Sequence, residues 1–286
     1  MIATLEKLYG TYLGGWARFR REHFTVFAGP REGPLAAVDA PPWSYFADPF
    51  PWVHAGEPWL LMEEFQYFKN HGRLITRRLS GGPSEEIHLD GRGHASFPCV
   101  FEIDGELHLL PETGEDGTLD LYVCERFPDR WRLRHRLLRD VDAADSVPLF
   151  HDGRWWVISS LRESKADGGH RSLGIFQCED LRTDAPAPHP VNRERRYVDS
   201  PYSYGRSAGP IHVSRELTMF RPIQISRKVY GEALGWTRID LLSATQFVET
   251  LCEKAPSEVG QLPGHPLHHV AGHGPWLACD TRDRRP

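Results

Sequence analysis

The sequence has few cysteines, no long apolar run and no excess of basic residues. Its five cysteines are an odd number, and no two of them have the C-x-x-C spacing of a zinc knuckle. No apolar run reaches the roughly 18 residues of a transmembrane helix, and residues 1–15 lack the basic start and long apolar stretch of a signal peptide. We therefore expect no disulfide framework, no membrane span and a cytoplasmic location.

The charge balance excludes two classes of partner. The net charge is −5 and the isoelectric point is about 6.3, whereas binding to nucleic acid or to an anionic membrane requires a basic surface. Hydrophobic residues make up 40% of the chain and charged residues 26%, which is enough apolar material for a buried core. The 286 residues fit one large all-β domain or two medium ones.

Helical periodicity is also scarce, and a hairpin pattern recurs in its place. The one helix candidate is residues 2–13. Each copy of the hairpin has an apolar strand, a tight turn that most often contains glycine, and a second apolar strand. The five copies begin near Asp48, Ser96, Asp145, Ser207 and His268.

A third apolar run, and often a fourth, follows each of the first four hairpins. Three to four antiparallel strands repeated every 48 to 62 residues are typical of a propeller blade. We predict an all-β, five-bladed β-propeller over residues 1–286, with a short N-terminal helical segment. The strand-like run "HFTVF" at residues 23–27 would complete the fifth blade and close the ring. The alternative is an open β-sandwich, whose strands would not repeat one hairpin five times.

A propeller would bring distant carboxylates together. The inner strands of the blades converge at one mouth of a central funnel, so Asp48, Glu64, Glu112 and Asp145 are predicted to face one cavity. Grouped carboxylates repel, which separates their pKa values and lets one act as an acid and another as a base. Glycoside hydrolysis uses such a pair. For any one of them a turn or strand-end role is the simpler interpretation, and their recurrence favours a shared site.

Other polar and aromatic residues near the strand starts are candidates for substrate binding. Aromatic rings would stack on a sugar, and the planar donors of an arginine would suit a polyhydroxyl or anionic ligand. Channel histidines are favoured over a metal site, which would need a third ligand such as His94 or His212, and no metal or cofactor is predicted. The candidates are Trp43, Tyr45, Glu64, His94, Ser96, Arg206, Arg221, Gln224, His268 and His269.

Several of these segments resemble the propeller domain of the glucosamine inositolphosphorylceramide transferase family. They include "YFADPFPW", "HASFPCVFE", "DSVPLFHDGRWWV" and "RSAGPI", and the resemblance runs from about residue 43 to residue 249. More distantly the pattern is similar to the five-bladed furanosidase superfamily, which includes family 43 glycoside hydrolases. The resemblance implies that Asp48 is a base, Glu112 a proton donor, and Asp145 a second acid or a modulator of its neighbour's pKa.

The sequence also departs from these families. Ser96 and Phe97 stand where a furanosidase would show an aspartate, and Ile225 follows Gln224 where relatives have an acidic residue. In the plant-type proteins this region is joined to a separate glycosyltransferase domain, for which 286 residues leave no room. The family name therefore does not by itself make this chain a transferase.

Three functions remain open at this point. The first is an enzyme that acts on a glycoside or sugar-containing metabolite by carboxylate acid/base chemistry. The second is a non-catalytic propeller that binds a glycan or another ligand and supports a partner enzyme. The third is a tailoring enzyme of secondary metabolism that uses the same pocket for cyclisation or transfer.

Overall fold

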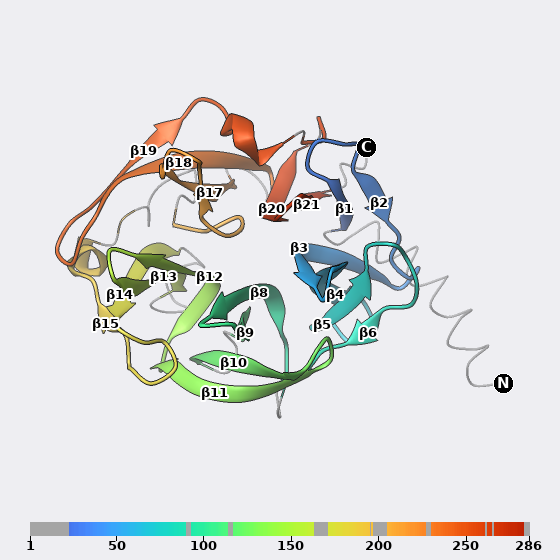
Figure 1. The fold of residues 1–286 in the computed structure, drawn as a ribbon, viewed down its shortest axis with the longest axis horizontal. Coiled ribbons are helices and arrows are strands. Elements are labelled where there is room, and N and C mark those ends of the chain that lie inside the picture. Colours follow the sequence, from blue (N-terminus) through green and yellow to red (C-terminus); the bar gives the residue numbers. More distant parts are fainter. Residues whose placement is uncertain are drawn as a thin grey trace.

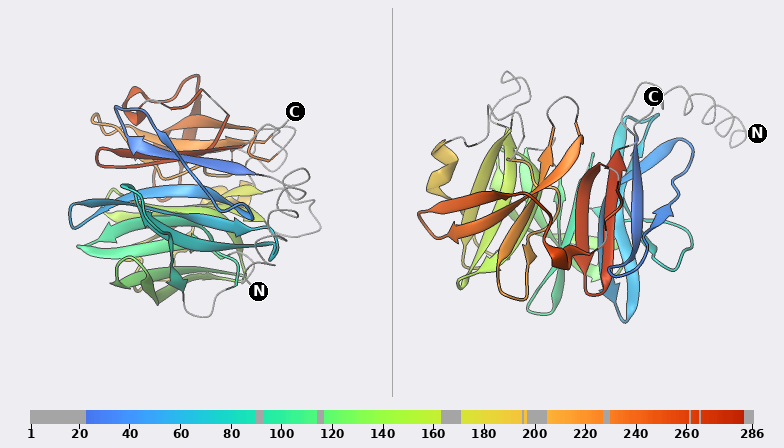
Figure 2. Two further views of the ribbon diagram at one scale, coloured as in Figure 1. Left: turned by 90° about the vertical axis from the view of Figure 1, so that its right-hand side faces the viewer. Right: turned by 90° about the horizontal axis from the view of Figure 1, so that it is seen from above.

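The five predicted blades are present. The structure, a computed structural model, describes residues 23–89, 93–113, 117–162, 171–194, 196, 205–226, 230–260, 262–264 and 266–282. Its strands form five sheets around a common centre (Figure 1), and Figure 2 shows the same ring from two sides. The prediction of an all-β, five-bladed propeller is confirmed, while the predicted helical segment at residues 2–13 lies outside the described residues.

The first three blades follow the chain in order, and each begins with its innermost strand. Blade I contains β3 Ser44–His54, β4 Glu57–Gln66, β5 His71–Arg78 and β6 Glu85–Glu86. Blade II contains β8 Ser96–Ile103, β9 Glu106–Glu112, β10 Thr118–Arg126, β11 Arg130–Arg139 and β7 His88–Leu89. Blade III contains β12 Asp142–His151, β13 Arg154–Arg162, β14 Ser172–Cys178 and β15 Ala187–Pro188.

The remaining two blades are joined to the rest by short 3₁₀ helices. Blade IV contains β16 His212–Val213, β17 Met219–Ile225, β18 Ala233–Leu242 and β19 Phe247–Cys252. Blade V contains β20 Leu267–His273, β21 Trp276–Arg282, β1 Phe24–Pro30 and β2 Ala36–Val38. The 3₁₀ helices are η3 Pro190–Glu194, before blade IV, and η4 Ser257–Val259, before blade V.

Blade V is built from both ends of the described chain. Strand β1 pairs antiparallel with β21, from Phe24 opposite Arg282 to Pro30 opposite Trp276, and the two strands lie side by side in Figure 1. This closure leaves no open seam in the ring of blades. The prediction that residues 23–27 complete the fifth blade is confirmed.

One predicted strand is divided between two blades. Residues 86–89 were expected to form a fourth strand of blade I. In the structure, β6 pairs with β5 of blade I, whereas β7 runs parallel to β11 of blade II. The link thus ties the outer edges of the two blades together.

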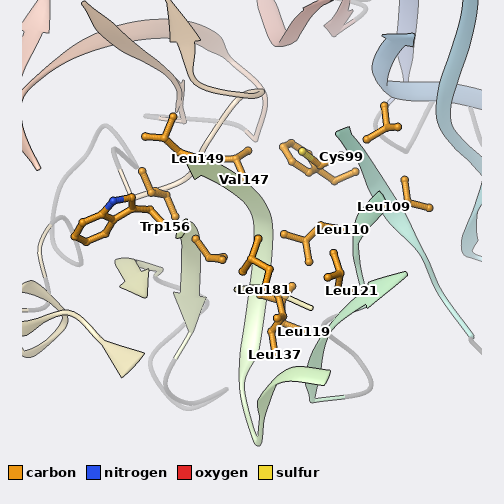
Figure 3. Close-up of a cluster of buried hydrophobic side chains, with 14 of the residues drawn as sticks. Cys99, Leu109, Leu110, Leu119, Leu121, Leu137, Val147, Leu149, Trp156 and Leu181 are labelled. Carbon is orange, nitrogen blue, oxygen red and sulfur yellow. The ribbon is translucent and has the colours of Figure 1, made fainter. Parts of the chain in front are cut away.

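Apolar side chains fill the space between neighbouring blades. Figure 3 shows leucines of blade II, among them Leu110 and Leu121, packed near Val147 and Leu149 of blade III. Burying each such side chain stabilises the fold by roughly 1.5–3 kcal/mol. This packing fixes the inner ends of the strands relative to one another.

A β-bulge recurs at those inner ends. In blades I, II and III the register between the first two strands skips, so that two residues oppose one. The first bulge residue is Asp48, Phe97 or Asp145, with φ of 50°, 48° and 49°, a region that few residues other than glycine adopt. Blade V has its own register shift at His268. The bulges of blades I to III place the Asp48, Phe97 and Asp145 side chains at equivalent positions.

Candidate active site

Five acidic side chains from four blades gather at the inner ends of the strands. Four are buried and Glu112 is partly buried. The charges of the other four all bear on the pKa of Glu63, which shows that they lie together. This set, called the carboxylate cluster below, comprises Asp48 from β3, Glu63 from β4, Glu112 from β9, Asp145 from β12 and Asp280 from β21.

Two members of the cluster, Asp48 and Asp280, lie beside His268. These three residues are called the histidine group below. Nδ1 of His268 donates to the Asp280 carboxylate at 3.2 and 3.3 Å, and the backbone N–H of Asp48 donates to the same carboxylate at 2.8 Å. Oδ1 of Asp48 lies 3.6 Å from His268 Nδ1, and among the described residues it has no hydrogen-bond partner. A buried oxygen of this kind is available to a ligand or a water molecule.

Two other members of the cluster, Glu112 and Asp145, lie beside Arg206. These three residues are called the arginine group below. Nε of Arg206 donates to the Asp145 carboxylate, and its Nη2 lies 4.0 Å from Glu112 Oε2. The backbone N–H of Asp145 also donates to Glu112 Oε2, at 3.4 Å. The Arg206 and Glu112 side chains are 20% and 15% exposed, so the arginine group is the part of the cluster that solvent reaches.

Tyr230 lies against both groups. Its hydroxyl is 2.9 Å from Nε2 of His268, and the guanidinium carbon of Arg206 lies 4.7 Å from its ring centroid. Such a distance is within the range of a cation–π contact.

Burial and mutual repulsion raise the pKa values of several of these acids. Burial, and next the Asp145 charge, raise the pKa of Glu112 to about 7, although Arg206 opposes the shift. Burial also raises the pKa of Asp48 and of Glu63 well above their ordinary values. The cluster therefore retains protons at neutral pH.

The two histidines of "HHV" behave differently. Burial by itself would lower the pKa of His268, but the carboxylates of Asp280 and Asp48 outweigh it and raise that pKa. Burial lowers the pKa of His269 to about 4, and this ring packs against Phe50 and Phe97. His268 is thus a polar partner of the cluster, whereas His269 is neutral, with its Nδ1 3.7 Å from Oδ1 of Asp48.

The prediction that Glu64 repeats the position of Glu112 is wrong by one residue. Glu63 pairs with Ala47 in blade I, as Glu112 pairs with Ser96 in blade II. Because side chains alternate along a strand, a shift of one residue moves a side chain to the opposite face. The Glu64 carboxylate instead accepts hydrogen bonds from Ser44 and Arg73, at 2.9 and 2.8 Å.

The one-residue register shift also applies to Ser96, which was predicted to bind substrate. The bulge position of Asp48 and Asp145 is occupied in blade II by Phe97, and Ser96 precedes it. The Phe97 ring is buried against Phe50 and His269. Blade II therefore contributes an apolar side chain where blades I and III contribute carboxylates.

The structure also places Arg221 elsewhere than expected. Its guanidinium donates to both oxygens of Glu249, at 3.0 and 2.6 Å, and the two side chains are 0% and 1% exposed. Thr237 donates to the same carboxylate. Arg221 thus belongs to a buried ion pair inside blade IV, and its assignment to substrate binding is corrected.

Two other predicted residues, His94 and Gln224, lie near the cluster. The backbone N–H of Gly72 donates to His94 at 2.9 Å, and a Cβ at Gly72 would collide with both Glu63 and His94. The absence of a side chain there leaves the space that Glu63 occupies. Gln224 is fully buried, and its backbone N–H donates to the carbonyl of Arg206, which ties β17 to the segment that carries Arg206.

The two predicted aromatic platforms differ in exposure. The Tyr45 ring is buried among Phe24, Phe65 and Tyr67. Trp43 is half-buried, and its carbonyl accepts a hydrogen bond from the Tyr67 backbone. Tyr45 therefore packs the junction of blades I and V.

The histidine group has the spacing of a possible cation site. One ligand atom from each of its three residues lies within 4.8 Å of the others. Nδ1 of His268 would have to lose its proton to bind a metal, and that proton now bridges His268 and Asp280. Neither His94 nor His212 completes the set, since His212 lies 3.8 Å from Glu258 in another part of the molecule.

The sequence gave weak signals for the residues that were missed. Glu63 stands beside the predicted Glu64, and Asp280 precedes Thr281, which ends the fifth hairpin in the repeat alignment. The Glu63 error follows from aligning Ser96, rather than the bulge residue Phe97, with Asp48. Tyr230 lies between strands and has no repeat equivalent, so the repeat pattern could not single it out.

Comparison with known proteins identifies the family. The family described as "Glucosamine inositolphosphorylceramide transferase 1, N-terminal" matches residues 35–261. The chain belongs to this family. The resemblance seen in the sequence segments is therefore confirmed.

Curated members of the glucosamine inositolphosphorylceramide transferase family are much longer than this chain. Glucosamine inositolphosphorylceramide transferase 1 of Oryza sativa subsp. japonica is 27% identical over 259 residues, which cover 86% of this chain and 34% of that protein. The Arabidopsis thaliana protein of the same name is 28% identical over 214 residues, covering 73% and 27%. The chain thus spans about a third of the length of the curated relatives it matches.

Solved glycoside hydrolases share the fold. A family 62 hydrolase in complex with xylotriose superposes with a TM-score of 0.56 at 12% identity, covering 90% of this chain and 96% of that one. A family 117 glycoside hydrolase of Zobellia galactanivorans gives a TM-score of 0.53 at 10% identity, covering 92% and 90%. At such identities the likeness shows the five-bladed architecture alone.

Proposed function

We propose that this chain is a sugar-active enzyme that uses carboxylate acid/base chemistry in the carboxylate cluster, on a glycoside or a sugar-containing metabolite. The observation that carries the proposal is the contrast between two acids. Glu112, at the solvent-reached edge, has a pKa raised to about 7, whereas buried Asp48 has a carboxylate oxygen without a hydrogen-bond partner in the described part of the chain.

Glu112 is assigned as the general acid. An acid works best when its pKa lies near the working pH, since it is then both protonated and a ready donor. Asp145 keeps Glu112 in this range, because its nearby charge raises the pKa that Arg206 alone would lower. Asp145 is therefore a modulator that Arg206 holds in place.

Asp48 is assigned as the general base in its deprotonated form, which the charged imidazole of His268 favours although burial raises the Asp48 pKa. Its Oδ1 would accept the proton of an attacking hydroxyl while Glu112 protonates the leaving glycosidic oxygen. The C–O bond to the leaving group breaks as the C–O bond to the attacking hydroxyl forms. Water as the attacking group gives hydrolysis, and a sugar or lipid hydroxyl gives transfer, so one site serves either reaction.

The relatives support sugar chemistry without fixing the reaction. The curated relatives are named as transferases, whereas the solved neighbours include hydrolases, among them an exo-β-1,3-galactanase of Clostridium thermocellum with a TM-score of 0.52 at 12% identity, covering 80% of this chain and 59% of that one. Acid and base are needed in both classes. The reaction type follows from the acceptor, which the experiment below identifies.

A non-catalytic, glycan-binding propeller that supports a partner enzyme is the second candidate. The observation that favours it is Phe97 in place of an acid in blade II. It predicts sugar binding without turnover.

No helix in the described part of the chain is long and apolar enough to span a membrane.

The test compares Asp48→Asn and Glu112→Gln with a control variant, Glu57→Gln, whose carboxylate is exposed on β4. The substrates are nitrophenyl arabinofuranoside, xyloside, galactoside and glucosaminide, each with water or a sugar alcohol as acceptor. Asp48→Asn should lose about 10²–10⁴-fold in turnover on any substrate that the wild type accepts. Glu112→Gln should lose less, because nitrophenolate leaves without a proton, and its loss should grow on alkyl glycosides.

The control should keep wild-type turnover. Full activity of Asp48→Asn would contradict the proposal. Calorimetric binding of the same sugars with no turnover by the wild type would favour the binding propeller instead.

A further inference from the structure

Tyr230 joins the two parts of the carboxylate cluster. On one side its hydroxyl lies 2.9 Å from Nε2 of His268, in the histidine group. On the other, its ring lies 4.7 Å from the guanidinium carbon of Arg206, in the arginine group. The histidine group comes from blades I and V and the arginine group from blades II and III and the segment before β16, and Tyr230 touches a cationic member of each.

The hydroxyl contact has a defined direction in each protonation state. Nδ1 of His268 donates to Asp280, so Nε2 accepts from the phenol when the imidazole is neutral and donates to it when the imidazole is charged. A phenol can act as donor or as acceptor. Burial raises the pKa of Tyr230 well above its ordinary value, so the hydroxyl keeps its proton throughout.

The ring contact orients Arg206. The face of an aromatic ring is electron-rich, so it attracts a guanidinium and holds it in one position. From that position Arg206 reaches the Asp145 carboxylate and approaches Glu112. Without the ring, the guanidinium would be free to leave the cluster for solvent.

The backbone holds Tyr230 in place. Its carbonyl accepts a hydrogen bond from Arg282 at 2.6 Å. The next residue, Gly231, has a φ of 66°, and a Cβ there would press against Phe24 and His268. Glycine at this position lets the turn approach His268 closely enough for the phenol to reach Nε2.

We propose that Tyr230 is a positioning residue of the candidate active site, which orients Arg206 through its ring and His268 through its hydroxyl. The assignment rests on the proposed function, in which Glu112 and Asp48 are the acid and the base. It adds a residue that lies in neither the repeated hairpins nor the cluster itself. It also explains how two groups from different blades keep one arrangement.

Two variants separate the two contacts. Tyr230→Phe keeps the ring and removes the hydroxyl, whereas Tyr230→Leu removes both. Arg206→Met is the reference for complete loss of the guanidinium. Glu112 is the reporter for the arginine group, and the charges that bear on it are those of Asp145, Arg206 and Arg171, together with the other acids of the carboxylate cluster.

The measurement is nuclear magnetic resonance of the full chain with ¹³C-labelled glutamate carboxyls and ¹⁵N-labelled histidine. Glu112 is assigned by its loss in Glu112→Gln, and His268 by its loss in His268→Gln. Tyr230→Leu should raise the Glu112 pKa in the same direction as Arg206→Met, and Tyr230→Phe should leave it unchanged. The Nε2 resonance of His268, recorded at one pH, should move in both Tyr230 variants.

These readouts do not depend on turnover. A wild-type His268 resonance in Tyr230→Phe would overturn the hydroxyl contact, even if Tyr230→Leu fails to fold. An unchanged Glu112 pKa in folded Tyr230→Leu would overturn the ring contact. Absence of turnover on every glycoside contradicts the proposed function and leaves both of these measurements decisive for Tyr230.

Discussion

Two arginine–carboxylate pairs of this propeller differ in their balance of charge. Inside blade IV, Arg221 and Glu249 are almost completely buried, and one guanidinium meets one carboxylate through two hydrogen bonds. At the cluster, Arg206 is 20% exposed and faces two acids, Asp145 and Glu112. The first pair is neutral as a unit, whereas the second has an excess of negative charge.

The difference separates a structural ion pair from a candidate site. A matched, buried pair has no reason to bind a proton or a ligand, and breaking it leaves a lone charge in the interior. A buried acid beside a second, unmatched acid holds a proton, because burial and next the Asp145 charge raise the pKa of Glu112. A proton held near neutral pH can be given to a substrate.

Removal of the arginine should separate the two pairs most clearly. Arg221→Met should destabilise the fold by about 3–5 kcal/mol, because Glu249 would be left buried and unpaired. Arg206→Met should cost less, because the cluster can bind a further proton in place of the guanidinium. Denaturant unfolding at pH 6 and pH 8 measures both, and the cost of Arg206→Met alone should increase with pH. Equal, pH-independent costs would contradict the comparison.

The pH dependence of stability should sharpen the comparison between the two arginine–carboxylate pairs. The folded state raises the Glu112 pKa from 4.5 to about 7, so between these values the unfolded chain loses a proton that the folded chain keeps. Stability contributed by this group therefore falls as pH rises from 4.5 to 7, by about 3 kcal/mol in total. Glu112→Gln should lose this dependence, so its stability relative to wild type should rise over that window and level off above it. A constant difference in denaturant unfolding across the window would show that Glu112 has an ordinary pKa.

An exposed pair gives the smallest expected effect. Arg132 and Glu125 lie 2.9 Å apart on blade II, and their side chains are 52% and 49% exposed. Arg132→Met should change the free energy of unfolding by less than about 1 kcal/mol, since solvent screens such pairs. The change should shrink further in high salt. A cost approaching that of Arg221→Met would mean that burial does not explain the difference between the pairs.

Much of the site could be predicted once the repeat was recognised, but the register could not. The repeat brought Asp48, Glu112 and Asp145 to one end of the ring, where the structure has them. Phe97, not Ser96, is the blade II equivalent of Asp48, so Glu63 rather than Glu64 faces the cluster. Arg206 was predicted because it lies close to the mouth of the central funnel. Arg221 has the same chemistry, but its guanidinium is paired with Glu249.

The sequence by itself determined the strands, the five-fold repeat and the family, because these depend on local patterns of apolar residues and turns. The tertiary structure decided which charges meet. Whether an arginine is paired, and whether a carboxylate keeps its proton, depends on burial and on partners contributed by other blades. Tyr230 shows this best, since its importance comes from His268 and Arg206, which lie 38 and 24 residues away along the chain and are brought to it only by the closed ring.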